Sequence, residues 1–539
     1  MEKMGSRHGD SMHSLHHRAC RSILAVFLLA VSLLGCSPDR AAQVREQGET
    51  AQQQGVIESG QQGAGQEGQQ AAARPQTDGS ERKGDVVPGV PGALEKGGTT
   101  PQEVVLSYLA GLRDQDLERM EAAFLDEGDL GGITRQYAVL CGIDQIPELA
   151  SGGPVSLRES GSAERLFKQL EQQIQATDLG SIRYMGLLPV EKYLDAHRLD
   201  IYQTLCAASA KNDGGDSLVS QVVFIDINGD EYALFFDTIE KEGRWYIQQL
   251  GGTLAHMMDL DAELAGTLRL DAEDKEHLLQ LLEDTSEDLP APGSSGSGPQ
   301  MTCPQVQGEG YDTPQQAAAA YLEGLKAHDM DQILRAFAVE SYGEAYDLQA
   351  AMEESQGYIF LRQEVSFPPA SELARALLCA GRKEKLEQDI RQQASALYLC
   401  SQYVSGTSEG RDEEGMGLDW EELPEKLGLE TIRLLGEIPA EEIAKACGGL
   451  KDAYKELDQK KARRYGAQQV EPCALVFTCA GGKCVLFIET AQYDGKWYDS
   501  QLGNLLSQGV GLPVDLMGTA PLDVLDGMVD VEAVLKPVG

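Results

Sequence analysis

The sequence predicts an α+β fold that occurs twice in tandem. Two long stretches carry the same short motifs in the same order, and each stretch passes from helical hydrophobic patterns at its start to strand-like alternation at its end. We therefore expect two copies of one domain, in which N-terminal helices pack on a curved antiparallel sheet. A signal peptide and a disordered linker are expected to precede them.

The repeat extends through the whole length of each copy. Three pairs of motifs carry it: Tyr108-Leu109 with Tyr321-Leu322, Ile182-Arg183 with Ile432-Arg433, and Trp245-Tyr246 with Trp497-Tyr498. Their offsets are 321 − 108 = 213, 432 − 182 = 250 and 497 − 245 = 252 residues. The order is kept and the offset grows only by insertion, which indicates a tandem duplication. An insertion of 250 − 213 = 37 residues is expected in copy 2, between Phe337 and Ile432.

Composition divides the chain into five segments. Residues 36–98 are rich in Gln, Gly, Ala and Glu and cannot bury a core, and Gly, Ser and Pro crowd the stretch around 290–298. The expected segments are a signal peptide (1–35), a lipid-anchored cysteine with a disordered linker (36–98), copy 1 (99–285), a second linker (286–310) and copy 2 (311–539).

The N-terminus has the pattern of a bacterial secretory signal. Arg18 and Arg21 precede a short apolar run, which ends in Leu33-Leu34-Gly35-Cys36. This ending resembles the bacterial lipobox, which implies that the chain is cut before Cys36 and that Cys36 takes a palmitate-type lipid. The alternative is an uncleaved membrane anchor, although the apolar run is short for a span.

Charge excludes several classes of ligand. The chain has 86 acidic and 45 basic side chains, a net charge of −41. Such a surface repels nucleic acid and anionic lipid. The histidines beyond the signal peptide are His197, His256, His277 and His328, and their spacing suits no metal site. We expect no metal and no cofactor.

Each copy should begin with a capped helix and end in hairpins. Thr100 or Thr313 is expected as an N-cap, with Pro at the first helical position and Glu103 or Gln316 completing a capping box. Asn228-Gly229 marks a tight turn between two strands of copy 1.

These motifs resemble nuclear transport factor 2-like domains, which share the cystatin-like α+β cone. The resemblance rests on the Thr-Pro-Gln opening, the Tyr-Leu-x-Gly-Leu helix and the late Gly-[Arg/Lys]-Trp-Tyr strand of each copy. It implies helices packed on a curved antiparallel sheet around a pocket. The middle of each copy does not match the family's compact pattern, and a novel α+β repeat is the alternative.

Four polar residues are candidate pocket residues. Arg183 and Arg433 lie in apolar surroundings, so each either binds an anion in a pocket or pairs within the core or at its surface. Asp237 and Glu489 follow apolar strands. The resemblance implies that a pocket acid can act as a proton-transfer base, and the alternative is a solvent-facing strand acid.

Two further motifs have a local interpretation. Asp226-x-Asn228-x-Asp230 resembles a calcium loop but has no Gly at the required position, so we expect a hairpin. Cys479 and Cys484 flank a presumed Gly481-Gly482 turn, which would place them face to face and within disulfide range.

The sequence contains no catalytic motif, and this decides the functional hypothesis. We expect a membrane-anchored extracytoplasmic lipoprotein, in which the tandem domains bind an unknown small molecule or protein without catalysis. The alternative is an isomerase- or hydratase-like enzyme that uses Asp237 or Glu489.

Overall fold

The structure is a computed structural model of the chain. It describes residues 96–125, 129–146, 155–156, 162–188, 190–257, 265–271, 305–354, 358–359, 368–405, 420–447, 450–512 and 516–538. The predicted signal peptide, Cys36 and most of both predicted linkers lie outside the described residues. Within the part of the chain that is described, no helix is long and apolar enough to cross a membrane.

Copy 1 begins with helix α3 (Pro101–Asp114), where the sequence predicts it. The Thr100 hydroxyl accepts a hydrogen bond from the Glu103 N–H, which satisfies one of the free donors of the first turn. The Glu103 carboxylate accepts from the N–H of Thr99, at 2.7 Å. The predicted cap is confirmed, and the glutamate also returns to the backbone that precedes the helix.

Copy 1 contains eight further helical elements after α3 among the described residues. They are α4 (Leu117–Glu121), α5 (Leu130–Leu140), η1 (Ile143–Gln145), α7 (Ser162–Ala176), η2 (Leu179–Ser181), α8 (Val190–Tyr193), α9 (Ala196–Asn212) and α10 (Gly252–Met257).

The sheet of copy 1 is antiparallel, as expected. Its strands are β2 (Arg183–Leu187), β3 (Ser217–Ile227), β4 (Asp230–Lys241), β5 (Arg244–Leu250) and β6 (Thr267–Arg269), in the order β2-β3-β4-β5 with β6 also paired to β4. Asn228 and Gly229 have φ of 54° and 92° between β3 and β4. Both central residues of this tight turn therefore have positive φ, and the predicted hairpin is confirmed.

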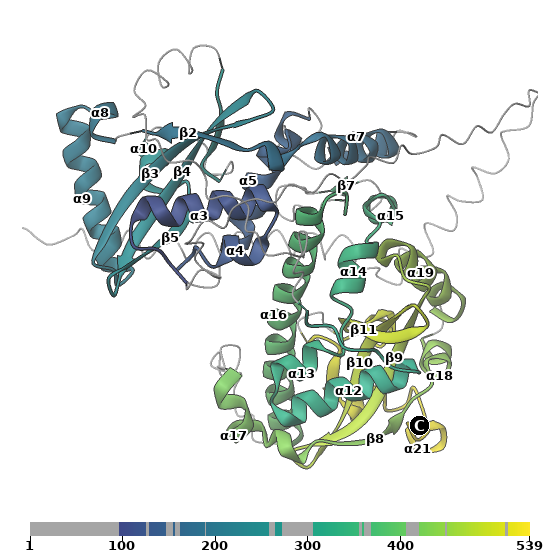
Figure 1. The fold of residues 1–539 in the computed structure, drawn as a ribbon. Helices are drawn as coiled ribbons and strands as arrows, with labels where there is room; N and C mark the ends of the chain where they lie inside the picture. The colour runs from purple at the N-terminus through teal and green to yellow at the C-terminus, as the bar shows by residue number, and fades with distance from the viewer. Residues whose placement is uncertain are drawn as a thin grey trace, which may run out of the picture. The chain divides into compact units, whose positions relative to one another are not determined.

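Copy 2 has the same strand order. Its strands are β8 (Arg433–Glu437), β9 (Gln469–Cys479), β10 (Gly482–Tyr493), β11 (Lys496–Leu502) and β12 (Thr519–Pro521), in the order β8-β9-β10-β11 with β12 paired to β10 (Figure 1). Even the register shift recurs, between Asp237 and Thr238 in β4 and between Glu489 and Thr490 in β10. The α+β architecture, with helices before each antiparallel sheet, is as the sequence predicts.

The helices of copy 2 include those of its insertion. They are α12 (Pro314–Ala327), α13 (Met330–Leu334), α14 (Glu340–Ala345), α15 (Leu348–Glu354), α16 (Glu372–Ser405), η6 (Trp420–Glu422), α17 (Leu423–Leu427), η7 (Leu429–Thr431), α18 (Ala440–Ala446), α19 (Leu450–Tyr465), α20 (Leu505–Gly509), η9 (Leu522–Leu525) and α21 (Val531–Val534).

Both faces of each sheet are covered by helices. We call the face that packs on α3 or α12 the inner face, and the face that packs on α9 or α19 the outer face. In copy 1, Val223, Phe236 and Ile247 belong to the inner core, whereas Phe224 and Phe235 belong to the outer core with α9. Successive strand residues thus serve different cores, which explains why β3 and β4 are apolar almost throughout.

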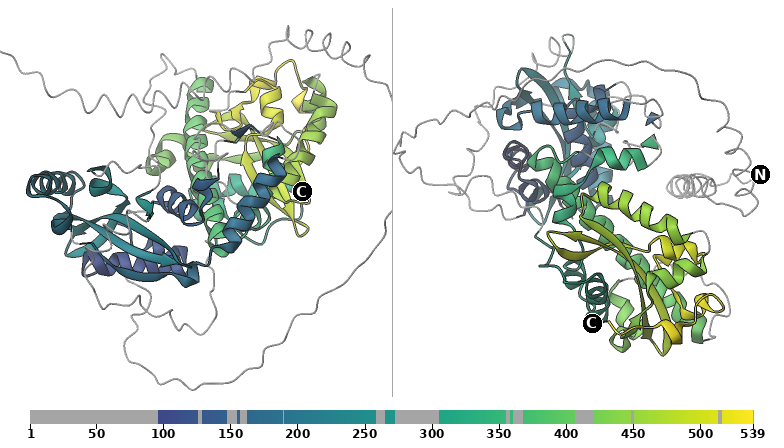
Figure 2. Two further views of the ribbon diagram at one scale, coloured as in Figure 1. Left: turned by 90° about the horizontal axis from the view of Figure 1, so that it is seen from above. Right: turned by 90° about the vertical axis from the view of Figure 1, so that its right-hand side faces the viewer.

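The insertion of copy 2 contributes to the core of copy 1. Helix α16 is 34 residues long and runs without a break (Figure 1). Leu373 and Leu377, in its first turns, belong to the hydrophobic core of copy 1, whereas Leu386 and Ile390 belong to that of copy 2. The Gln115 side chain accepts a hydrogen bond from the Leu373 N–H at 3.3 Å. The short strands β1 (Val155–Ser156) and β7 (Tyr358–Ile359) also pair between the copies. Figure 2 shows the sheet and helices of each copy in two further views.

This packing predicts that removing an apolar side chain from the start of α16 destabilises copy 1. Leu373 is fully buried, so Leu373→Ala should lower the free energy of unfolding by about 2–5 kcal/mol. Arg391→Ala, at an exposed position of the same helix, should change it by less than about 0.5 kcal/mol. Calorimetry of the purified protein measures both. An equal effect of the two changes would contradict the shared core.

Candidate functional site

Asp237 lies on the outer face of the first sheet and is completely buried. It is therefore not the solvent-facing strand acid that its position suggested. Its Oδ1 accepts from the Ser220 hydroxyl at 2.5 Å, and its Oδ2 accepts from the N–H and the hydroxyl of Thr253, each at 2.8 Å. Gln249 adds a longer bond of 3.3 Å. The carboxylate is saturated with donors, and two of them come from the first turn of α10.

Glu489 occupies the same position in copy 2 and is equally buried, so its solvent-facing interpretation is also wrong. Its partners differ. It forms an ion pair with Lys461 of α19 and accepts hydrogen bonds from Tyr465 at 3.0 Å and from Ser500 at 3.1 Å. Lys461 lies near the end of α19 in a run of basic residues with Lys460, Arg463 and Arg464, and its ion pair gives this lysine an internal role. Neither predicted acid is poised as a free base.

The two predicted arginines do not line a pocket. Arg183 is the first residue of β2, its side chain is 71% exposed, and it lies 3.6 Å from Asp226. Arg433 is the first residue of β8 and is exposed as well. The apolar surroundings in the sequence belong to alternate strand residues. Both arginines lie at the surface, where Arg183 pairs with Asp226, so the surface alternative holds and the pocket interpretation is wrong.

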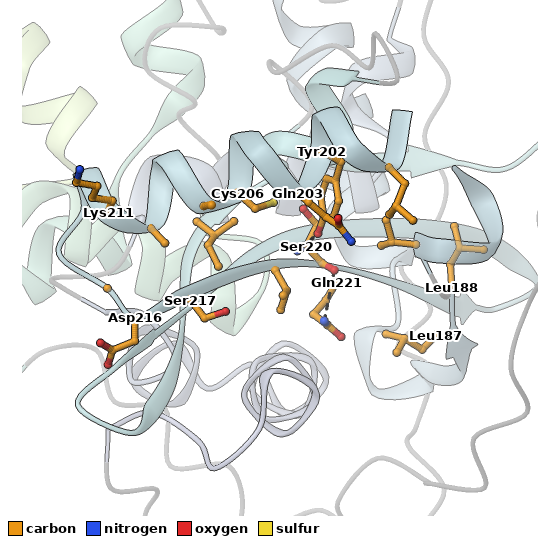
Figure 3. A pocket seen from close by; sticks show the side chains of 17 residues that line it. Leu187, Leu188, Tyr202, Gln203, Cys206, Lys211, Asp216, Ser217, Ser220 and Gln221 are labelled. Carbon is orange, nitrogen blue, oxygen red and sulfur yellow. Dashed lines mark hydrogen bonds between the residues drawn. The ribbon is translucent and has the colours of Figure 1, made fainter. Parts of the chain in front are cut away.

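A groove of about 590 Å³ lies between α9 and β3 in copy 1. Figure 3 shows Tyr202, Gln203 and Cys206 of α9 projecting towards Ser220 and Gln221 of β3. Lys211 and Asp216 lie at one end, and Leu187 and Leu188 lie at the other (Figure 3). The volume is typical of small-ligand sites, and the lining combines apolar with polar groups.

Part of the groove wall is fixed by hydrogen bonds. β2 pairs with residues 223–226 of β3, and the Leu188 N–H extends this contact to the Val222 carbonyl, so residues 217–221 have a strand neighbour on one side only. The Tyr202 hydroxyl accepts from the Ser220 N–H at 2.7 Å. Burial raises the pKa of Cys206 to about 11, so this thiol is not a nucleophile at neutral pH. The groove is suited to binding and offers no activated group.

The sequence did not reveal Asp499, the most unusual acid in the structure. It lies on the inner face of β11, where copy 1 has Ile247, and its side chain is completely buried. Neither carboxylate oxygen has a hydrogen-bond partner within the described residues. Burial raises the pKa of Asp499 well above its ordinary value. The sequence signal that could have identified Asp499 is the comparison of the two copies, because the corresponding residue of copy 1 is the apolar Ile247.

Asp458 is a second buried acid that appears only in copy 2. It lies on α19 opposite the outer face, at the position of Cys206 in copy 1, and it is 6% exposed. Its Oδ1 lacks a hydrogen-bond partner among the described residues. Burial, followed by the charge of Glu489, raises the pKa of Asp458 to about 7. The residue is therefore close to its titration point at neutral pH.

The acidic turn of copy 1 is a hairpin, as predicted. Asp226 lies in β3 and Asp230 begins β4 on either side of the turn. Within the described residues, no group of His, Cys, Asp or Glu side chains is arranged to hold a metal ion.

The predicted disulfide between Cys479 and Cys484 is wrong, because the turn lies one residue earlier. Ala480 and Gly481 have φ of 49° and 80° and are its central residues. Cys479 therefore pairs with Gly482, and Cys484 lies opposite Phe477. Both thiols are free and buried. Cys379 of α16 is disulfide-bonded.

Comparison with known proteins gives a distant structural similarity. The chain resembles a cystatin-like protein from Ruminococcus gnavus ATCC 29149 with a TM-score of 0.36 and 14% sequence identity, over 78% of this chain and 92% of the other. No protein-family model matches the sequence. A search of curated proteins gives no match either.

The bonds to Asp237 predict a structural role. Asp237→Asn removes the charge that binds the first turn of α10 and should lower the free energy of unfolding by about 1–3 kcal/mol. Asp230→Asn on the same strand is the control. Its side chain is 53% exposed, so the change should cost less than about 1 kcal/mol. Denaturant titration compares them, and an unchanged stability of Asp237→Asn would refute the role.

Proposed function

We propose that this protein is a lipid-anchored, extracytoplasmic binding module without catalytic activity. A lipid on Cys36 would hold the chain at the membrane. The segment from residue 36 to 98 would act as a tether with a reach of roughly 40 Å, and copy 1 would bind a small amphipathic ligand in the groove between α9 and β3. The groove is the observation that carries the binding part of this proposal.

The disulfide at Cys379 supports export. Structural disulfides persist in oxidising compartments and are rare in the reducing cytosol. The strongly acidic composition is compatible with this location, because it keeps a protein soluble and away from anionic surfaces. Together with the lipobox-like Leu33-Leu34-Gly35-Cys36, these features favour the outer face of the cell membrane.

The groove favours an elongated ligand with one apolar end. Leu187, Leu188 and Val190 would contact the apolar part, and Gln203 and Gln221 offer amide groups along the groove. Lys211 and Asp216 place a cation and a carboxylate at the far end, which suits a polar head group that the lysine can bind. Polar groups placed within an apolar lining are the usual means of orienting a small molecule.

An enzymatic function has weaker support. An acid that acts as a base must reach its substrate's proton. The oxygens of Asp237 and Glu489 are occupied by donors from the protein itself. Asp499 has free oxygens but is completely buried, so a substrate could reach it only if copy 2 opened.

The anchor can be tested by fractionation. Cys36→Ala removes the acyl acceptor, so the protein should move from the membrane fraction to the soluble fraction of cells that express it. Ser37→Ala, the neighbouring change, should leave it with the membranes. Detection by immunoblot measures the distribution, and membrane association of Cys36→Ala would refute the anchor.

The groove can be tested with an amphipathic anion. We expect the soluble protein that lacks residues 1–36 to bind 8-anilinonaphthalene-1-sulfonate saturably and in a 1:1 ratio. Ala207→Trp fills the groove and should weaken binding at least about tenfold, or about 1.4 kcal/mol.

Ala208→Trp is the matched control. Ala207 and Ala208 are both exposed on α9, but only Ala207 lines the groove, so the two changes have a similar cost for the helix. Equal binding by both variants, or binding that does not saturate, would overturn the proposed ligand site. This result is independent of the outcome for Cys36.

A further inference from the structure

Copy 2 contains two buried acids at positions where copy 1 has none. Asp499 lies on the inner face of its sheet and replaces Ile247, and Asp458 lies against the outer face and replaces Cys206. The correspondence of Asp499 to Ile247 is seen in the structure as well as in the sequence. Ile247 forms a parallel bridge with Phe124, and Asp499 forms the equivalent bridge with Phe337. Copy 1 therefore serves as an internal reference for what each acid changes.

The surroundings of Asp499 do not neutralise its charge. Its charge acts on Tyr311, on Tyr321 of α12 and on Cys473 of β9, and none of these is a cation. The guanidinium of Arg382 on α16 donates to the carbonyl of the next residue, Ser500, and burial alone raises the pKa of Asp499. The nearby helix has also lost side-chain volume, since Ala317 and Ala318 stand where copy 1 has Val104 and Val105. An ionised carboxylate here would be buried without a partner, which is very unfavourable.

Asp458 faces a mixed cluster. Glu489 on β10 and Glu471 on β9 oppose its ionisation, whereas Lys461 on its own helix favours it. Lys461 is already paired with Glu489. Arg464 and Arg382 act on Tyr465, which donates to Glu489 in the same cluster. Asp458 itself is influenced by two acids and by Lys461, so its ionisation adds a further negative charge between α19 and the sheet.

From these contacts we propose that copy 2 is a pH-responsive unit, in which α12 and α19 loosen from the sheet as the pH rises through neutrality while copy 1 stays closed. Two buried acids, one on each face of the same sheet, must lose their protons together with the packing around them. Loosening of α19 would expose the apolar cluster that includes Tyr465, Val470 and Tyr493.

The direction follows from proton linkage. In the open or unfolded state an aspartic acid has a pKa of about 3.9, whereas burial raises the pKa of both acids in the closed state. The closed state therefore binds more protons. Its stability is fully present below about pH 4 and is lost as the pH rises, through about 7 for Asp458. Within this window each acid shifts the opening equilibrium by about tenfold per pH unit.

Hydrogen exchange of the full chain, followed by mass spectrometry, tests this proposal. After correction for intrinsic exchange, protection factors in α12, β11 and α19 should fall at least about tenfold between pH 5.5 and 7.5. Protection in α3, β5 and α9 of copy 1 should stay constant in the same samples. Constant protection in both copies, or an equal fall in both, would overturn the proposal.

Substitution of the two acids distinguishes their titration from a generally low stability of copy 2. Asp458→Asn with Asp499→Asn keeps the shape of both side chains and cannot ionise, so the protection of copy 2 should become independent of pH. If the double variant fails to fold, Asp499→Ile is the second test, because it introduces the residue that copy 1 has at this position. It should at least halve the change in the logarithm of the protection factors of copy 2 between pH 5.5 and 7.5. Variants that fold and keep the full pH response would contradict the proposal.

Discussion

A polar group that is buried between a sheet and a helix needs a hydrogen-bond partner, and this requirement determines which helix contacts the strand position that Asp237 and Glu489 share. Each sheet is covered on both faces, so polar strand side chains have little access to water. At the shared register shift, Asp237 meets the requirement with the first turn of α10. Glu489 meets it with Lys461 of α19. One scaffold position thus organises different helices in the two copies.

The change of partner has further consequences in copy 2. Because Glu489 turns to α19, it no longer caps the helix that follows β11. Asn504 takes this role and accepts from the N–H groups of Leu506 and Ser507. The Asn504 amide also donates to the carbonyls of Cys473 and Ile488, so it ties the cap to two strands. Satisfying both Glu489 and the start of α20 therefore involves coordinated differences from copy 1 at several positions.

The sequence was sufficient to predict the repeated fold but not the site. Helix caps and tight turns depend on neighbouring residues, so Thr100 and Asn228-Gly229 could be identified locally. The face of Asp237 could not, because strands buried on both sides lose the alternation that distinguishes inside from outside. The sequence left Asp237 and Glu489 either in a pocket or in solvent, and both are buried with partners from the protein itself.

The error at Cys479 had an available remedy. Asn228-Gly229 corresponds to Ala480-Gly481 at the offset of 252 residues, so the repeat itself specified the turn. Local turn preference favoured Gly481-Gly482, and the register set by the rest of the hairpin prevailed. The groove and Asp499 depend on contacts between distant segments and on differences between the copies. Residues that the two copies share therefore do not indicate them. Residues that both copies keep maintain the common scaffold, whereas differences such as Ser220 against Pro472 and Ile247 against Asp499 are where each copy can acquire a role of its own.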